Sequence, residues 1–522
     1  MYSSGMGGPA LLGAPPSWLA TDNHHTCGLD KPGGAARLQD ILTFLLHKLP
    51  YLLTLLMLRT RLVDLNAWAD KPSRKPLVLR GARQVGKSWL VRTWGTQRFG
   101  RVVEVNLERR PEIEACFTDN DPKAVLQRLE VHLGQRIPTD GSALLFLDEI
   151  QAVPEVLAKL RWFAEEMPQL PVIAAGSLLD FAFAEHRFSM PVGRISYLHL
   201  EPMGFLEFCH ACGEEPLARW LNHNLTMAVI RGGMPADLHD KAMALFRSWV
   251  LVGGMPAAVE AFARERSYLP VADVHRELLA TVRDDFAKYA DRVHHHRLAA
   301  VLDSVPNQLG QKFKYAKVDR DERSTALKQA LNLLTLARIC HRVVSTQGKG
   351  LPLGAGADAK TLKVIHLDVG LASSALRLNL ATLEQAEDLD LVNEGAIAEQ
   401  AIGQLLRLIG HGNEEPALWY WSREARSSSA EVDYITAPTS HVLPIEVKSG
   451  AGGAMRSLHV FMSEQKLSWA ARFNSVSPII QDIKTTAATG IAVRYRLLSL
   501  PAYAVECLPR LAHEMDTESR GA

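Results

Sequence analysis

The stretch PLVLRGARQVGKSWLVRTW, residues 76–94, decides the fold of this chain. Within it Gly81 is followed by four residues and then by Gly86, Lys87 and Ser88, which completes a G-x-x-x-x-G-K-[ST] motif. An apolar strand pattern precedes the motif and an amphipathic helix pattern follows it, which is the context that the motif requires. The sequence therefore predicts a phosphate-binding loop between a strand and a helix, rather than a chance glycine-rich turn.

The residue types of this loop suit a polyphosphate ligand. The two glycines let the backbone turn so that successive N–H groups point at the anion, and the following helix presents its positive N-terminal end to it. We expect Lys87 to reach the β and γ phosphates of ATP and the Ser88 hydroxyl to bind Mg²⁺. The expected nucleotide-binding residues are Gly81, Ala82, Arg83, Gln84, Val85, Gly86, Lys87, Ser88 and Asp148.

A second motif lies about 60 residues further along the chain. The run ALLFLDEI, residues 143–150, is continuously apolar up to Asp148 and Glu149, as expected for a strand that is buried on both faces of a parallel sheet. We expect Asp148 to hold Mg²⁺ through water and Glu149 to orient or deprotonate the water that attacks the γ phosphate. Together the two motifs predict an α/β fold with a P-loop NTPase parallel sheet, and an ATP hydrolase that uses ATP and Mg²⁺.

Two further residues are candidates for catalysis. Ser177 ends the apolar run PVIAAGS, where a polar side chain can sense the γ phosphate; a helix N-cap is the equally weighted alternative. Arg194, in PVGRI, is a candidate for stabilising transition-state charge, either in its own chain or from a neighbouring subunit of an oligomer, although a surface arginine is the commoner case. The expected catalytic residues are Lys87, Glu149, Ser177 and Arg194.

Composition limits the class of protein. The chain has 522 residues, of which 47% are hydrophobic and 22% charged, so we expect several globular domains. Its 58 Lys and Arg nearly balance its 57 Asp and Glu, so any DNA binding depends on a local patch. Six scattered cysteines favour free thiols in the cytoplasm. His47, Lys48 and Pro50 interrupt the apolar run 41–58, which argues against a membrane span.

The C-terminal part contains a second set of acidic residues. Three strands are expected at residues 418–424, 431–436 and 442–450, after a helix at 393–409. Asp433 lies on the second strand, and alternation places Glu446 and Lys448 on one face of the third.

With Glu394 from the helix, these residues follow the order of the PD-(D/E)xK nuclease-like fold. In that chemistry Glu394, Asp433 and Glu446 bind Mg²⁺ and Lys448 positions or activates water. An ordinary polar sheet face, on which Lys448 and Glu446 pair with each other, is the alternative.

The chain resembles the prokaryotic AAA-type ATPases that carry a C-terminal domain of unknown function with a restriction-endonuclease-like core. The resemblance covers about residues 57–505. It rests on these segments: RGARQVGKS (80–88), LFLDEIQ (145–151), AAGS (174–177), PVGR (191–194), VGGMP (252–256), EVDYI (431–435) and IEVKSG (445–450). It implies ATP binding and slow hydrolysis.

The expected organisation has five parts. They are a disordered or misassigned extension at 1–56 with the true start near Met57, an AAA-type P-loop ATPase domain at 57–215, a helical lid and winged-helix-like region at 216–360, a PD-(D/E)xK nuclease-like α/β domain at 361–505, and a C-terminal tail at 506–522. One hypothesis is an ATPase whose nucleotide state controls the C-terminal module, with DNA as a candidate partner. The other is an ATP-dependent switch that recruits protein partners and whose nuclease-like domain is inactive.

Overall fold

The computed structural model describes most of the chain from residue 58 onward. The described residues are 58–177, 179–180, 191, 193–286, 293–376, 395–425, 428–448, 450 and 455–521. The predicted extension 1–56, Met57 and Glu394 lie outside them. All described residues belong to one unit, Thr54–Ala522. Among the described helices, none combines the length and the apolar character needed to cross a bilayer.

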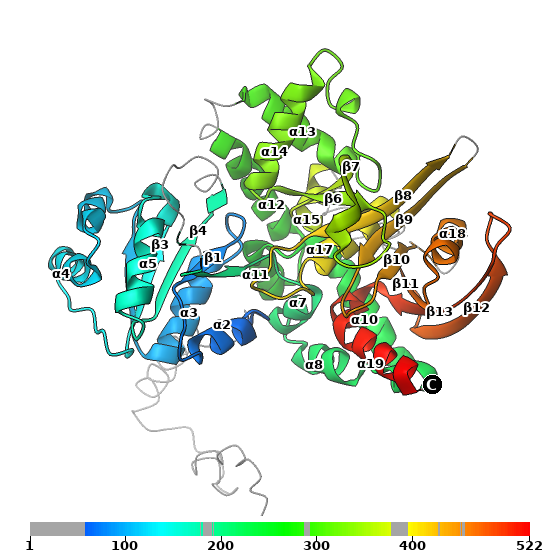
Figure 1. The fold of residues 1–522 in the computed structure, drawn as a ribbon, viewed down its shortest axis with the longest axis horizontal. Coiled ribbons are helices and arrows are strands. Elements are labelled where there is room, and N and C mark those ends of the chain that lie inside the picture. Colours follow the sequence, from blue (N-terminus) through cyan, green and yellow to red (C-terminus); the bar gives the residue numbers. More distant parts are fainter. Residues whose placement is uncertain are drawn as a thin grey trace, which may run out of the picture. The chain divides into compact units, whose positions relative to one another are not determined.

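The first sheet has five parallel strands in the order β2-β3-β4-β1-β5 (Figure 1). The strands are β1 (Leu77–Arg80), β2 (Val102–Asn106), β3 (Leu144–Asp148), β4 (Val172–Gly176) and β5 (Ser196–His199). The helices that accompany them are α2 (Leu62–Ala69), α3 (Lys87–Phe99), α4 (Pro122–Leu133) and α5 (Val156–Glu166), with short 3₁₀ turns η2 (Pro111–Thr118) and η3 (Ile150–Ala152).

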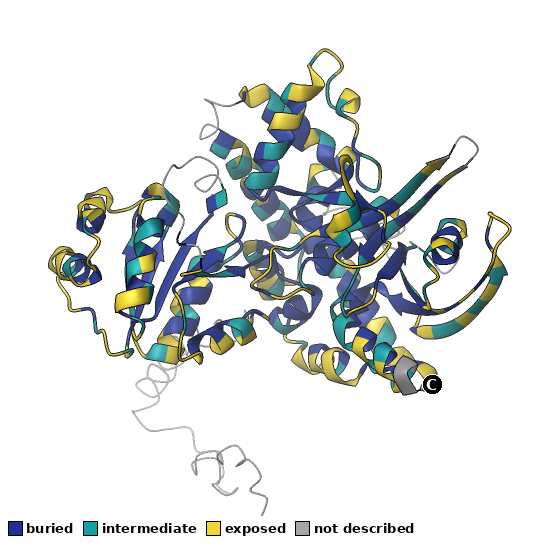
Figure 2. Cartoon of the chain, viewed as in Figure 1, coloured by how far each residue is buried: buried dark blue, intermediate teal, exposed yellow. Residues whose placement is uncertain are grey.

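Helices cover both faces of this sheet, which explains the uninterrupted apolar runs of its strands. Phe146 of β3 packs in the core that includes Trp94 of α3, whereas Leu145 and Leu147 pack in the core that includes Leu160 of α5. Every residue of β3 and β4 is buried, as Figure 2 shows along the sheet. The predicted parallel α/β sheet is therefore present.

Helices make up the next part of the chain, as the sequence predicts. They are α7 (Phe205–Ala211), α8 (Glu215–Asn224), α9 (Met227–Gly232), α10 (Ala236–Val252), α11 (Pro256–Glu265) and α12 (Leu269–Asp284). Cys209 of α7 and Cys212 after it are buried free thiols. The described cysteines thus agree with the expectation of free thiols.

The tetrapeptide GGMP occurs twice in this helical part, in different surroundings. At the second copy a Cβ added to Gly254 would lie 2.0 Å from the carbonyl oxygen of Met203, and Gly253 has φ +75°. At the first copy a Cβ on Gly232 would meet nothing within 4 Å. Only the second copy therefore needs its glycines for close packing.

The predicted winged-helix-like region contains two helices followed by a hairpin. Helices α13 (His295–Asn307) and α14 (Ser324–Leu336) precede the antiparallel strands β6 (Cys340–Thr346) and β7 (Ala357–His366), and all four share one hydrophobic core. However, β6 also pairs in parallel with β8 (Leu418–Ala425). The hairpin is therefore part of the C-terminal sheet and does not form a separate wing.

The second sheet has eight strands in the order β12-β13-β11-β10-β9-β8-β6-β7 (Figure 1). The strands not yet introduced are β9 (Ser428–Thr436), β10 (Leu443–Val447), β11 (Trp469–Asn474), β12 (Ile479–Thr486) and β13 (Ala492–Pro501). The helices of this part are α15 (Val369–Ala375), α17 (Gly395–Leu406), α18 (Arg456–Gln465) and α19 (Leu508–Gly521), with a 3₁₀ turn η8 (Ala502–Cys507). The predicted meander is present, because β8, β9 and β10 pair antiparallel in sequence order.

Two of the predicted boundaries are wrong. The boundary between residues 360 and 361 falls inside β7, so the helical region and the C-terminal α/β region share one sheet. The predicted tail at 506–522 contains helix α19, whose Leu508, Leu511 and Met515 are buried in the main core.

Candidate functional site

The predicted phosphate loop connects the end of β1 to the start of α3. Gly86 has φ +90°, a left-handed conformation that favours glycine. Gly81 lies so close to the next segment that a Cβ would be 2.3 Å from the carbonyl oxygen of Leu200. Glycine is therefore needed at position 86 for the backbone conformation and at position 81 because there is no room for a Cβ.

Lys87 lies against the loop that it follows. Its Nζ donates hydrogen bonds to the carbonyl oxygens of Gly81, at 3.1 Å, and Ala82, at 2.7 Å. The side chain is buried, and this burial lowers the pKa of Lys87 to about 8, against the attraction of Glu149 and Asp148. The ammonium group is thus held inside the loop by two weakly basic carbonyls, which phosphate oxygens can replace.

Ser88 and Asp148 meet directly. The Ser88 hydroxyl donates a hydrogen bond of 3.0 Å to Oδ1 of Asp148, and Arg92 lies 3.6 Å from Oδ2. Burial raises the pKa of the Asp148 carboxyl. A hydroxyl and a carboxylate side by side at the end of a phosphate loop are oxygen donors that fit Mg²⁺. The structure thus brings together the two residues that the sequence predicts as metal-binding.

Glu149 and Ser177 lie at the same edge of the sheet as the loop. Glu149 directly follows β3 with φ +53°, and its Oε2 accepts a hydrogen bond of 2.5 Å from Nε2 of Gln151. Ser177 follows β4, which lies between β3 and β1, and its side chain is buried. Because the carboxyl ends of parallel strands meet at one edge, both residues lie at the edge that carries the loop, and the charge of Glu149 acts on Lys87.

Arg194 lies elsewhere, and its position argues against a role in its own chain. It precedes β5, whose first residue Ser196 is in register with Leu77 at the start of β1. The loop follows the other end of β1, so Arg194 lies at the opposite edge of the sheet. There its Nε donates a hydrogen bond of 2.6 Å to Glu165, at the end of α5, and half of its side chain is exposed. A role toward the nucleotide of a neighbouring subunit stays a prediction.

Sequence reasoning missed Arg59, which binds the backbone of the phosphate loop. Arg59, which is buried, donates a hydrogen bond of 2.7 Å to the carbonyl oxygen of Val85 and one of 2.6 Å to that of Glu201. Its Nε also pairs with Glu207 at 3.0 Å. Each partner is far from Arg59 in sequence, so local pattern contains no signal for these contacts.

A buried ion network begins at the residue before the loop. Arg80 pairs with Asp180, and Oδ2 of Asp180 also accepts a hydrogen bond of 2.9 Å from Arg338. Arg338, which is 4% exposed, lies 3.8 Å from Glu201 and 3.1 Å from Glu415. Thus Arg338, which lies between α14 and β6, contacts residues of both the ATP-binding part and the C-terminal part.

The network continues to the C-terminal part through Arg407, directly after α17. Nε and Nη2 of Arg407 each donate a hydrogen bond of 2.9 Å to a different oxygen of Glu201, and Nη1 donates one of 2.9 Å to the carbonyl oxygen of Pro416. Burial alone would raise the pKa of Glu201, but Arg407, His341 and Arg338 hold it well below its usual range. Glu201 is therefore an ionised, buried carboxylate that joins the two sheets.

The second predicted site is only partly assembled. Lys448 and Glu446 lie on one face, as predicted, and form an ion pair of 2.6 Å. Oδ2 of Asp433 accepts a hydrogen bond of 2.7 Å from the backbone N–H of Val447. Burial and the neighbouring Asp433 raise the pKa of Glu446 to about 7. Over the described part of the chain, no group of three or more His, Cys, Asp or Glu side chains is arranged to hold a metal ion.

A lysine that the sequence reasoning missed lies among these acids. Nζ of Lys363, on β7, is 2.8 Å from Glu399 of α17, 2.5 Å from Glu431 of β9 and 3.9 Å from Asp433. Burial alone would lower the pKa of Lys363, but Glu399, Asp433 and Glu431 raise it above its usual range. The helix contributes Glu399 to the cluster, whereas Glu394 lies outside the described residues.

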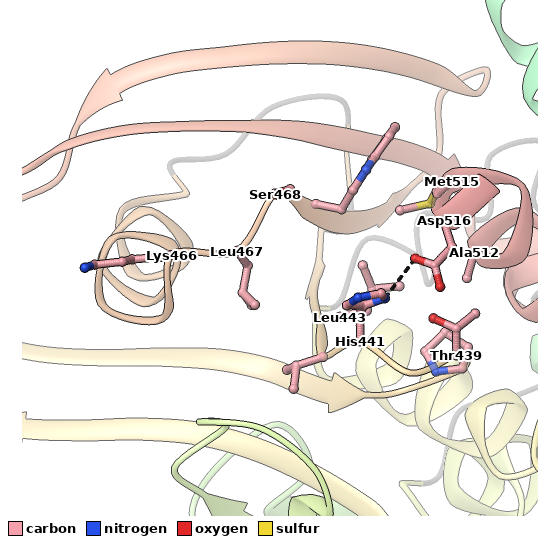
Figure 3. Close-up of a pocket in the computed structure, with 12 residues that line it drawn as sticks. Thr439, His441, Leu443, Lys466, Leu467, Ser468, Ala512, Met515 and Asp516 are labelled. Carbon is pink, nitrogen blue, oxygen red and sulfur yellow. Dashed lines mark hydrogen bonds and ion pairs between the residues drawn. The ribbon is translucent and has the colours of Figure 1, made fainter. Parts of the chain in front are cut away.

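An apolar cavity of about 220 Å³ lies beside the starts of β10 and β11. It is lined mainly by the turns that flank β10 and β11 and by α19, and His441 pairs with Asp516 at 3.0 Å in it (Figure 3). Neither the phosphate loop nor the Lys363 cluster contributes to its lining. The cavity is therefore separate from both candidate sites.

The chain was compared with curated proteins, solved structures and family models. Among the curated proteins, none matches this chain. Similar solved structures include the Walker-type ATPase of Pyrococcus abyssi, with 15% identity over 61% of this chain and 94% of that chain and a TM-score of 0.38. The ORC2 protein of Aeropyrum pernix has 13% identity, the same two coverages and a TM-score of 0.30. The ORC1 protein of Aeropyrum pernix in complex with DNA has 16% identity over 63% of this chain and 95% of that chain, with a TM-score of 0.25.

Three family models match separate parts of the sequence. Residues 243–382 match a domain of unknown function, DUF8612, and residues 394–486 match another, DUF4143. Residues 73–209 match the AAA domain, and this range contains the phosphate loop, Asp148, Glu149 and Ser177. The chain therefore carries an AAA-type ATPase domain, which confirms the prediction of an ATP hydrolase.

Proposed function

We propose that this protein binds and hydrolyses ATP with Mg²⁺ at the edge formed by the phosphate loop, Asp148 and Glu149. The observation that carries the proposal is the 3.0 Å hydrogen bond between Ser88 and Asp148, because it joins the two motifs that come from separate segments. Main-chain N–H groups of residues 81–88 bind the phosphates, and Lys87 exchanges its loop carbonyls for phosphate oxygens.

The other residues complete the reaction. Ser88 and Asp148 hold Mg²⁺, which when bound supplies positive charge that offsets the charge of the phosphates. Glu149, freed from Gln151, orients or deprotonates the attacking water, and Ser177 senses the γ phosphate. The charge of Glu149 acts on Lys87, which supports a position of its carboxylate beside the phosphate-binding lysine.

Two substitutions test this assignment. Lys87→Ala removes the phosphate contact, so we expect loss of ATP binding in a titration with a fluorescent ATP analogue. Glu149→Gln keeps the size of the side chain but removes the base, so we expect ATP to bind and its hydrolysis to slow by about 10²- to 10⁴-fold. A Glu149→Gln protein with the wild-type hydrolysis rate would refute the role of Glu149.

We further propose that the nucleotide state is transmitted to the C-terminal part. The ion network supports this, because Arg80 adjoins the loop while Arg407 adjoins α17, and Asp180, Arg338 and Glu201 connect them. A shift of β1 on ATP binding changes these contacts, and α17 carries Glu399 of the acidic cluster. Hydrogen exchange with and without ATP tests this; unchanged protection of residues 395–406 would argue against it.

The C-terminal module is proposed to have a PD-(D/E)xK nuclease-like fold. Its support is the order of elements: helix α17, antiparallel β8, β9 and β10, then α18 and β11, which is parallel to β10. DNA is the candidate partner of such a module. A metal-dependent cleavage assay with and without ATP, on wild type and Lys448→Ala, tests for activity.

One observation favours the second hypothesis, a switch whose nuclease-like module does not cleave. The acids of the module already have cationic partners, because Glu399 and Glu431 contact Lys363 and Glu446 contacts Lys448. In this case ATP binding controls recruitment of protein partners. Lys87→Ala then abolishes recruitment, whereas Glu446→Ala leaves it intact.

A further inference from the structure

Lys363 is an unusual residue for its position. It lies in the run TLKVIHL, where β7 turns from exposed to buried residues, and it is 1% exposed. A buried ammonium group is costly unless carboxylates surround it. Here three do, Glu399, Glu431 and Asp433, with the ring of Tyr420 centred 5.2 Å away.

These carboxylates come from the elements that would build a nuclease metal site. Glu399 is on α17, and Glu431 and Asp433 are on β9, whereas Lys363 comes from β7 of the preceding region. The lysine therefore reaches from the hairpin β6–β7 into the acids of the following module. Attachment of β6 to β8 within the same sheet fixes the hairpin in this position.

The partners of these acids leave a divalent cation few oxygens, among them Oε2 of Glu446, which is buried without a hydrogen-bond partner. Mg²⁺ needs several oxygens at about 2.0–2.1 Å in octahedral geometry. One oxygen of Glu399 and one of Glu431 are bound to the ammonium, and one oxygen each of Asp433 and Glu446 is bound to Val447 and Lys448. A metal ion among them would also lie beside a fixed positive charge.

We infer that the Lys363 ammonium group takes the place of the divalent cation in this acidic cluster. The inference rests on the proposed nuclease-like fold and favours the inactive module over the cleaving one. The module keeps the acids as ligands of an internal cation, binds no Mg²⁺ through them and does not cleave. Removal of Lys363 leaves a ring of acidic oxygens that can accept a divalent ion.

Manganese binding to the nucleotide-free protein tests this inference. Free Mn²⁺ is measured by electron paramagnetic resonance, and thermal unfolding is followed with and without Mn²⁺. Lys360→Ala, which removes an exposed lysine from the same strand, is the matched control. Asp433→Asn identifies any binding that depends on the cluster.

In wild type and Lys360→Ala we expect the acidic cluster to bind no Mn²⁺, so the Asp433→Asn change removes no Mn²⁺ site from either protein. Neither unfolding temperature therefore rises through Mn²⁺ bound at the cluster. Lys363→Ala gains one Mn²⁺ site, at least tenfold tighter than any in the wild type, and Mn²⁺ raises its unfolding temperature. Both gains disappear in Lys363→Ala/Asp433→Asn.

Two results would overturn the inference. One is a wild-type Mn²⁺ site that Asp433→Asn removes, and the other is a folded Lys363→Ala protein that gains no site. If Lys363→Ala does not fold, the comparison of wild type with Asp433→Asn still decides. Because no nucleotide is present, the outcome is independent of the ATPase assays, whose failure would refute the ATP-site proposal alone.

Discussion

Replacement of Arg407 by Met tests the buried ion pair that joins the two sheets. Methionine retains much of the apolar stem but removes the guanidinium, so Glu201 loses two hydrogen bonds of 2.9 Å and stays buried. Hydrogen bonds to charged groups contribute about 1.5–3 kcal/mol each. Two of them give about 3–6 kcal/mol, in agreement with about 3–5 kcal/mol for a buried pair that loses one partner. Both side chains are about 95% buried, so solvent screening does not reduce this value.

Urea unfolding followed by tryptophan fluorescence measures the effect, since the chain has ten Trp. We expect Arg407→Met to lower the free energy of unfolding by about 3–5 kcal/mol at an unchanged denaturant slope. The double variant Glu201→Leu/Arg407→Met should recover most of the loss, because it leaves no unpaired charge.

An Arg→Met change in an exposed pair provides the control. Arg219 pairs with Glu215 on the surface of α8, and Arg219→Met should leave the unfolding midpoint unchanged. If Arg407→Met has the same small effect as Arg219→Met, the buried pair does not stabilise the contact between the sheets, and the reasoning fails.

Three further predictions concern the ATP site and its surroundings. The affinity for ATP should not depend on the ionisation of Lys87 at pH 7 and should weaken by up to about tenfold per pH unit above pH 8. Above pH 8 the free protein loses the ammonium charge of Lys87, whereas bound phosphates raise the pKa of Lys87, so ATP binding takes up a proton. An affinity that stays constant from pH 7 to 9.5 would contradict this. Gly254→Ala should destabilise by about 1–3 kcal/mol in a thermal melt because its Cβ would meet the carbonyl of Met203, whereas Gly232→Ala in the other GGMP copy should be tolerated; equal effects would contradict it. Arg194→Ala should leave ATP hydrolysis unchanged in dilute protein, and a loss there would show that Arg194 acts within its own chain.

The ATP site could be predicted from sequence because its residues obey local rules. Gly81 to Ser88 form one continuous motif, and Asp148 ends an apolar strand. Since parallel strands end at one edge of a sheet, two such segments must come together. The meander β8–β9–β10 was also predictable, because alternating strands with short turns pair with their neighbours.

The ion network and the Lys363 cluster were not predictable in this way. Arg338, Glu201 and Arg407 belong to three segments that only the fold brings together, and nothing in their local patterns pairs them. A single lysine inside the apolar run TLKVIHL was the available signal for Lys363, but it did not indicate which acids surround it. The position of Arg194 was not predictable either, because a glycine-arginine pair does not reveal at which edge of a sheet it lies.

The missed boundary has a related cause. The first four residues of β7 are exposed and its last five are buried, so the change in composition near residue 361 looks like the start of a new domain. In fact it marks the place where an edge strand enters the core.

The continuous eight-stranded sheet has a practical consequence for fragments of this protein. A piece excised at residue 394, the start of the match to DUF4143, would lose β6 and leave the backbone of β8 without its parallel neighbour. Such a bare edge invites self-association. A C-terminal fragment that keeps this edge paired therefore begins before the β6–β7 hairpin, near α13, and takes part of the neighbouring family region with it.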